Sequence, residues 1–194
     1  MKAQPGLKSA FLKKIATIFE KNLKDDRITI PLMKTIEILL QSDYLSEPVL
    51  ADDLIMIHGL CVKECNKSKV IVKLMASIGV FANMLSFRNE ELNQKALKSL
   101  LFLLYHSFPK VRKITAEKLY TGLLALEDYS MIIPGGDEEA YEQAIEMLSE
   151  TDWSQHLKEI AAATKVAFYA FFGLKPKPKE SEDVEMKWDV KLFE

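Results

Sequence analysis

A spacing of about 40 residues between similar apolar segments constrains the fold of this chain more than any other feature. The segments begin at Ile30, Val70 and Val111, so the successive steps are 40 and 41 residues. Each segment follows another apolar stretch with helical spacing and a short polar break. A period of this length is typical of proteins built from stacked pairs of helices, in which each pair buries its apolar face against its neighbours.

The apolar periodicity predicts eight helices, and no stretch shows the alternation that is typical of a strand. In order, they form four pairs, and a longer linker containing Pro134–Gly136 precedes the last pair. The predicted fold class is therefore all-α, a HEAT or armadillo-like helical-repeat solenoid with about four helix pairs. We expect residues 1–173 to be one such domain, the C-terminal part of a longer solenoid. The predicted helices span residues 7–23, 28–40, 48–65, 68–85, 89–107, 109–127, 137–149 and 153–172.

Several helix ends are predicted from local signals. Ser68, Asn89 and Asp137 are expected to be N-caps, because their side-chain oxygens accept hydrogen bonds from free backbone N–H groups. Pro31 and Pro109 are expected in the first turn of a helix, where a missing N–H costs little.

The last segment, residues 174–194, differs in composition from the rest of the chain. Lysine and proline alternate over residues 175–179, acidic and polar residues follow, and Trp188 lies in a short apolar stretch at the end. Such a composition favours extended or disordered chain. The segment is predicted to be a disordered or docking tail, and three roles stay open for Trp188: folding back onto the domain, docking to a partner, or none.

The composition predicts a protein of the cytoplasm. Of the 194 residues, 48% are apolar, which is enough for one core or one short solenoid. No run of 18 apolar residues is present, so no membrane-spanning helix is expected. The first residues lack the continuous apolar core of a secretory signal, and two cysteines do not make a disulfide framework.

Charge is distributed unevenly along the chain. Residues 1–118 hold 19 Lys and Arg against 12 Asp and Glu, whereas residues 119–157 hold nine acids and no Lys or Arg. A basic body beside an acidic stretch suggests a charged partner, because such fields steer association. The alternative is that the surface of a solenoid carries uneven charge without a function.

The residues that metals favour do not form a convincing site. His58, Cys61 and Cys65 share one face of a predicted helix, but structural zinc takes four ligands. The other histidines, His106 and His156, are isolated in the sequence. A cysteine on a helix face is usually a small buried apolar residue. We therefore predict no metal, no cofactor, and structural roles for Cys61 and Cys65.

Catalysis and nucleic-acid binding are also disfavoured. Three scattered histidines give no arrangement of the serine or cysteine triad type. The Gly135-Gly136 loop is followed by three acids, which is the wrong charge for a phosphate site. The predicted isoelectric point is near 6.0, and the basic cluster around Lys110 lacks interleaved aromatic residues for base stacking. The chain is predicted not to be an enzyme.

Four motifs in the second half of the chain carry a resemblance to a known family. They are Phe108-Pro109-Lys110-Val111-Arg112-Lys113-Ile114-Thr115-Ala116, then Tyr120 and Leu123-Leu124, then Leu148-Ser149-Glu150-Thr151-Asp152-Trp153, then Phe172-Gly173-Leu174-Lys175-Pro176. Together, over about Ser107 to Pro176, they resemble the C-terminal region of tubulin-specific chaperone D, also called tubulin folding cofactor D. Residues 1–106 agree with that family only in their helical pattern.

This resemblance implies a chaperone that acts on tubulin. Family members hold β-tubulin, join it with α-tubulin through cofactor E, and release the α/β dimer with cofactor C. They also bind an Arf-like small GTPase, and together with other cofactors they stimulate GTP hydrolysis by tubulin. The implied location is the cytoplasm and the microtubule cytoskeleton. The alternative is a generic HEAT or armadillo scaffold or adaptor that binds another acidic protein.

Six cations near the starts of the predicted second helices are the candidate partner-binding residues. In a stacked solenoid they are expected to fall on one rim and to face an acidic protein. Arg112 has a second interpretation, which we favour: pairing with an acid of the neighbouring repeat. The six are Lys69, Lys73, Lys110, Arg112, Lys113 and Lys118.

Overall fold

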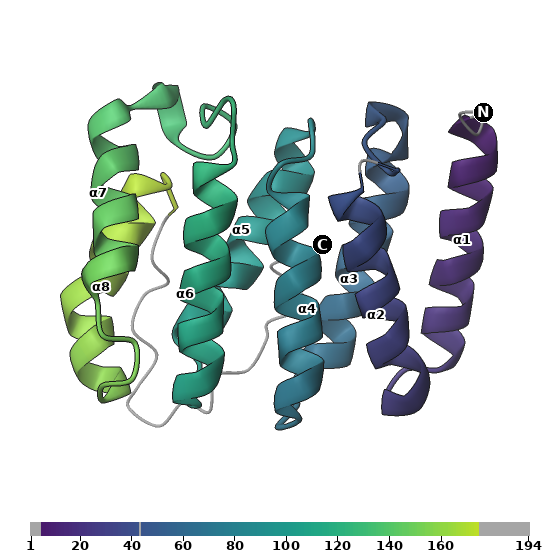
Figure 1. Ribbon diagram of the computed structural model, residues 1–194, viewed down its shortest axis with the longest axis horizontal. Coiled ribbons are helices and arrows are strands. Elements are labelled where there is room, and N and C mark those ends of the chain that lie inside the picture. Colours follow the sequence, from purple (N-terminus) through teal and green to yellow (C-terminus); the bar gives the residue numbers. More distant parts are fainter. Residues whose placement is uncertain (1–4, 43, 175–194) are drawn as a thin grey trace.

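The computed structural model describes residues 5–42 and 44–174, and within these ranges the chain is helical with no strand (Figure 1). This confirms the all-α fold class, and the arrangement is consistent with a helical-repeat solenoid. Apart from Leu174, the predicted tail lies outside the described residues. The elements are α1 (Pro5–Lys21), α2 (Asp26–Gln41), η1 (Pro48–Leu50), α3 (Ala51–Cys65), α4 (Ile71–Met84), α5 (Glu90–Leu104), α6 (Pro109–Leu124), η2 (Pro134–Gly136), α7 (Glu138–Glu150) and α8 (Leu157–Phe171).

The helices form two layers. Helices α2, α4 and α6 pack side by side in one layer, and α1, α3 and α5 pack in the other (Figure 1). The three segments on the 40-residue period belong to α2, α4 and α6, so the period corresponds to the spacing of one layer. Contacts run mainly between neighbours, as expected of a solenoid, and α1 packs on α2 and α3 at the end opposite α8.

The last helix pair departs from this order. Helix α7 packs directly against α6 instead of extending the α5 layer, and α8 packs on α7. The linker between α6 and α7 makes this possible, because Ile132 and Ile133 are buried in it. The rings of Tyr129 and Tyr141 stack with centroids 4.3 Å apart, and the Tyr141 hydroxyl donates to the Leu123 carbonyl at 3.1 Å. The linker is thus part of the core and turns the last pair.

Most of the predicted helix ends are present. Asn89 accepts from the Leu92 N–H at 2.9 Å, Asp137 accepts from the Ala140 N–H at 3.2 Å, and Pro109 opens α6. The N-cap predicted at Ser68 is wrong, because its hydroxyl accepts from the Val70 N–H and Val70 precedes the helix.

Two further helix starts differ from the prediction. Asp25 caps α2 two residues earlier than expected, so Pro31 lies inside the helix and not in its first turn. Pro31 cannot donate a hydrogen bond to the carbonyl four residues earlier, which belongs to Arg27. Because Arg27 is exposed, this missing bond costs less than it would in the core. Helix α8 begins at Leu157 and not at Trp153, because the Trp153 side chain is buried in the preceding turn and donates to the Leu148 carbonyl at 3.0 Å.

A buried ion network joins α2, α3 and α4. Glu64, at the end of α3, is fully buried, and its Oε1 lies 2.6 Å from the Lys73 ammonium of α4. The same ammonium lies 2.6 Å from Asp26 of α2. Glu64 also accepts from the Thr29 hydroxyl at 3.0 Å and from the Lys24 N–H at 2.6 Å. Burial opposes the charge on Lys73, but the hydrogen bonds to Asp26 and Glu64 outweigh it and raise its pKa.

We predict that replacing Lys73 with methionine lowers the free energy of unfolding by about 3–5 kcal/mol, because the buried Glu64 carboxylate then lacks a cation. Methionine keeps most of the side-chain volume, so the loss of stability measures the effect of removing the positive charge. The matched control, Lys69→Met, alters an exposed lysine close by and is expected to change stability by about 0.5 kcal/mol or less. Urea unfolding measures both. Similar midpoints for the two variants would contradict the network.

Candidate interaction surface

Consecutive helices alternate in direction, so the connectors lie on two edges of the solenoid. The connectors α1–α2, α3–α4 and α5–α6 share one edge, the lower one in Figure 1, where α4 and α6 begin. Exposed cations gather along this edge from three helix pairs. We call this set the basic edge, and it comprises Arg27, Lys63, Lys67, Lys69, Lys110 and Lys113.

Three of the predicted partner-binding residues belong to the basic edge. Lys69 lies in the α3–α4 connector, and Lys110 and Lys113 lie in the first turn and a half of α6. All three side chains are exposed. Lys113 also lies close enough to the exposed Asp152 for its charge to be among the causes that lower the pKa of that carboxyl, after the hydrogen bonds from Ser154.

The prediction that Lys73 lies exposed on this rim is wrong. Lys73 retains only 4% of its possible exposure, and its ammonium is enclosed by Asp26 and Glu64. A lysine near the start of a helix is ordinarily solvated, but here two carboxylates from neighbouring helices supply the charge and the hydrogen bonds that burial requires. Lys73 therefore holds helices together and is not available to a partner.

Arg112 is also buried, at 2% exposure, so the interpretation as a partner contact is wrong. Its favoured pairing with an acid of the next repeat is wrong as well, because the guanidinium donates to four backbone carbonyls. They belong to Trp153 at 3.0 Å, Gln155 at 2.6 Å, His106 at 2.9 Å and Ser107 at 3.1 Å. These carbonyls lie in the α5–α6 and α7–α8 connectors. Arg112 thus fastens the last helix pair to the rest of the solenoid, and burial lowers its pKa.

Lys118 lies in the middle of α6, so the prediction that places it on the rim is wrong. Its ammonium is 3.8 Å from Glu37 of α2, and its side chain is 40% exposed. The Glu37 side chain reaches across α4 at Gly79, where an added Cβ would collide with the carboxylate. Gly79 therefore permits a contact between α2 and α6, two helices that are separated by α4.

Reasoning from the sequence missed Arg27, Lys63 and Lys67 as members of the same edge. Lys63 lies in the last turn of α3, Lys67 lies in the connector and Arg27 lies in the first turn of α2. Their position could have been predicted from the order of the helices, because antiparallel helix pairs bring the end of each first helix beside the start of each second helix. The starts of the second helices therefore hold only part of the edge.

The opposite edge is acidic. It carries the connectors α2–α3, α4–α5 and α6–α7, the upper edge in Figure 1. Arg88 lies among these exposed acids, and the two edges thus give the domain an electrical polarity across its helices. The exposed acids are Asp52, Glu90, Glu91, Glu127, Asp128, Asp137, Glu138 and Glu139.

The residues considered as metal ligands are buried inside the solenoid. His58 lies with its Nε2 2.9 Å from the Ser99 hydroxyl and 3.1 Å from the Lys95 carbonyl, and its ring is 5.0 Å from that of Phe81. Cys61 and Cys65 are buried on the same helix, and burial raises the pKa of Cys65 to about 12. Within residues 5–42 and 44–174, no group of three or more His, Cys, Asp or Glu could hold a metal ion.

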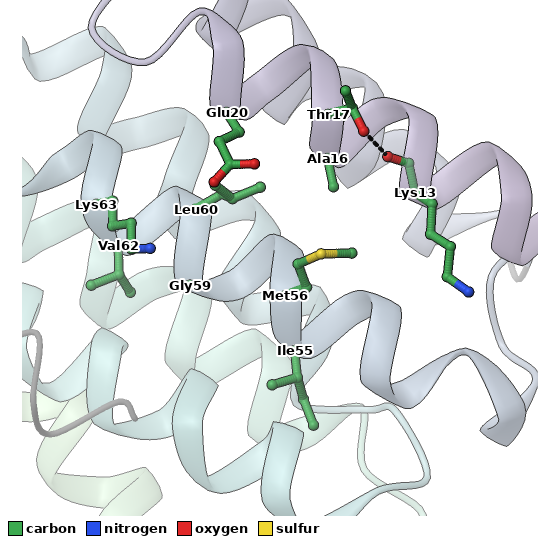
Figure 2. Close-up of a pocket in the computed structure, with 10 residues that line it drawn as sticks. All are labelled: Lys13, Ala16, Thr17, Glu20, Ile55, Met56, Gly59, Leu60, Val62 and Lys63. Carbon is green, nitrogen blue, oxygen red and sulfur yellow. Dashed lines mark hydrogen bonds between the residues drawn. The ribbon is translucent and has the colours of Figure 1, made fainter.

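A groove of about 520 Å³ lies between α1 and α3 (Figure 2). Its floor is apolar, with Ala16 from α1 and Met56 and Leu60 from α3. Met56 projects into the space between the helices and is 42% exposed. Gly59 keeps the middle of the groove open, because a Cβ added there would meet nothing within 4 Å.

Charged side chains flank the groove. Lys13 lies at one end of it, and Lys63 and Glu20 lie toward the other end (Figure 2). The Lys13 ammonium is 4.0 Å from Asp53, yet its side chain is 66% exposed. Lys63 belongs to the basic edge, so this end of the groove opens onto that edge.

The described residues form an all-helical structure consistent with a helical-repeat solenoid. Within it, residues 1–73 match the family model described as tubulin folding cofactor D C terminal. This is the family that the resemblance indicated, and the match covers α1, α2, α3 and the start of α4. The motifs between Ser107 and Pro176 lie outside the matched residues. Comparison with the solved structures gives no significant match. Among the described residues, no helix is both long and apolar enough to cross a membrane.

We predict that Arg112→Lys lowers the free energy of unfolding by about 3 kcal/mol, although it keeps the positive charge. A single ammonium does not span four carbonyls from two connectors, so buried acceptors lose their donors. The exposed neighbour provides the control, because Lys113→Ala is expected to leave the thermal midpoint nearly unchanged. An Arg112→Lys variant as stable as the parent would mean that the four bonds contribute little.

We also predict acid sensitivity that originates at His58. Burial, assisted by the charge of Lys95, lowers its pKa from 6.5 to about 3. Between these values the unfolded chain binds a proton that the folded chain does not, so this contribution to stability is complete above pH 6.5 and is lost as pH falls. At about 1.4 kcal/mol per pH unit, the decrease from pH 6.5 to 5 is about 2 kcal/mol.

His58→Gln removes this titration and is expected to reduce the slope of stability against pH over the same range. Urea unfolding at pH 5, 6 and 7.5 gives the slope for the parent and for the variant. Equal slopes would show that the imidazole is protonated in the folded protein or does not titrate differently on unfolding.

Proposed function

We propose that this chain is a tubulin-binding module of a tubulin folding cofactor, acting in the folding, assembly and disassembly of the α/β-tubulin heterodimer. The observation that carries the proposal is the basic edge on a fold whose first 73 residues match the cofactor D family model. The activity is binding, without catalysis by this chain. Its partners are β-tubulin and the α/β dimer, and its place of action is the cytoplasm and the microtubule cytoskeleton.

The charge of the edge suits the partner. Tubulin is acidic, and the edge presents Lys69, Lys110 and Lys113 on a rigid row of helix ends. Exposed charges act over a Debye length of about 8 Å at physiological salt, so they influence approach more than the final contact. We therefore assign to the edge the role of speeding and orienting encounter with tubulin.

Contacts with cofactors C and E and with an Arf-like small GTPase extend the same proposal. In it, the solenoid holds tubulin while the other cofactors bind, and stimulation of GTP hydrolysis takes place on tubulin itself. The acidic edge lies away from the basic edge across the helices, so a tubulin bound at one leaves the other accessible.

A generic scaffold for another acidic protein is the second candidate. The basic edge supports it equally, because the charges do not depend on the identity of the partner. The family match of residues 1–73 favours tubulin. A comparison of tubulin with an unrelated acidic protein as ligand separates the two candidates.

We predict that replacing Lys69, Lys110 and Lys113 together with glutamate slows association with the α/β-tubulin dimer about tenfold or more at low salt. The salt dependence of the association rate is also expected to flatten. Surface-plasmon or stopped-flow kinetics from about 25 to 300 mM salt measure both effects.

A matched variant controls for net charge. Lys34, Lys98 and Lys165 are exposed in the middle of α2, α5 and α8, so their replacement with glutamate changes the charge equally but away from the edge. This control is expected to retain most of the association rate. If both triple variants bind tubulin alike while remaining folded, the edge is not the surface of encounter.

A further inference from the structure

We propose that the α1–α3 groove is an anchoring site for a short helix of the acidic protein that docks on the basic edge. The helix would place one large apolar side chain in the groove and carboxylates toward its two ends. This inference rests on the proposed function. It adds an apolar contact in the groove to the electrostatic contact at the basic edge. It assigns the groove to a partner segment and not to a small molecule.

The shape of the groove supports a helical segment. Along α1 the lining residues extend from Lys13 to Glu20, which corresponds to about 10 Å of helix, or two turns. Gly59 leaves room at the centre, and Met56 and Leu60 offer apolar surface beneath it. Methionine has an unbranched, polarizable side chain that adapts to the shape of an inserted group. Helix-in-groove recognition uses these elements.

Charge selects an acidic segment. Lys13 and Lys63 lie at the two ends of the groove and both are exposed, whereas Glu20 is the acid among the lining residues. Asp53 approaches Lys13 to 4.0 Å, which is too long for a close ion pair and leaves the lysine able to bind a partner carboxylate. The lining therefore favours a negative ligand, in agreement with the edge that it joins.

Continuity with the basic edge supplies the geometric link. Lys63 belongs both to the groove and to the edge, and the Lys24 ammonium donates to the Lys63 carbonyl at 2.7 Å. The end of α3 is thus held firmly beside the α1–α2 connector. A protein that approaches the edge therefore also reaches the Lys63 end of the groove.

The two contacts predict different kinetic effects. Long-range charges on the edge govern the rate of encounter, whereas a buried apolar anchor governs how long the complex lasts. Filling the groove is therefore expected to speed dissociation of tubulin and to leave association almost unchanged. Reversing the charge of the edge is expected to slow association and to leave dissociation almost unchanged.

The experiment fills the groove at its open centre. Gly59→Trp places an indole where the structure has open space, and Gly59→Ala is the matched control that adds one methyl group and keeps the groove open. Kinetics with the α/β-tubulin dimer are measured for both, together with thermal unfolding. We expect Gly59→Trp to dissociate about tenfold faster than Gly59→Ala, with association rates within about twofold.

A second variant tests the floor without filling the groove. Met56→Gln keeps the length of a half-exposed side chain and removes its apolar end, so it is expected to speed dissociation while the thermal midpoint is kept. Equal dissociation rates for the parent, Gly59→Trp and Met56→Gln would show that the groove does not anchor tubulin. The basic edge would then remain as the proposed contact. A change of oligomeric state on sedimentation with Gly59→Trp would overturn it in favour of a second copy of this chain. Folded parent protein that binds no tubulin would overturn the proposed function as well.

Discussion

The buried carboxylate of Glu64 is the constraint on which the arrangement of the first two helix pairs depends. It is fully buried at the end of α3 and accepts hydrogen bonds from groups that α2, α4 and the α1–α2 connector provide. A buried charge is tolerated only where such partners are in place. The N–H of Lys24 is one of them, and Lys24 adopts a left-handed conformation with φ of 71° to present it. The charge therefore specifies how the two pairs meet.

Arg112 has the same role at the other end of the described solenoid. It joins the connectors α5–α6 and α7–α8 through four carbonyls, and within residues 5–42 and 44–174 no acid forms an ion pair with it. Both buried ions lie near the edge at which α4 and α6 begin. The exposed lysines of this edge therefore project from helix ends that buried contacts hold in place, which gives their charges a fixed pattern toward the proposed partner.

The helices and their order could be predicted because their signals are local. The apolar period, the caps at Asn89 and Asp137, and Pro109 at the start of α6 act within one helix turn. The burial of Lys73 and Arg112 could not be predicted in the same way. It depends on groups that lie far away in sequence, Asp26 and Glu64 for the first and Trp153 and Gln155 for the second. The groove was missed because Gly59 gives no apolar signal, and the opening exists only once α1 lies beside α3.

In the proposed mode of binding, an acidic partner approaches the basic edge and anchors in the adjacent groove. Hydrogen–deuterium exchange of this chain, with and without the α/β-tubulin dimer, distinguishes this mode from binding elsewhere. We predict slower exchange in the connectors at residues 66–70 and 105–108, in the first turn of α6 and along α3. Protection confined to the opposite edge, at residues 44–50, 85–89 and 125–137, would contradict it.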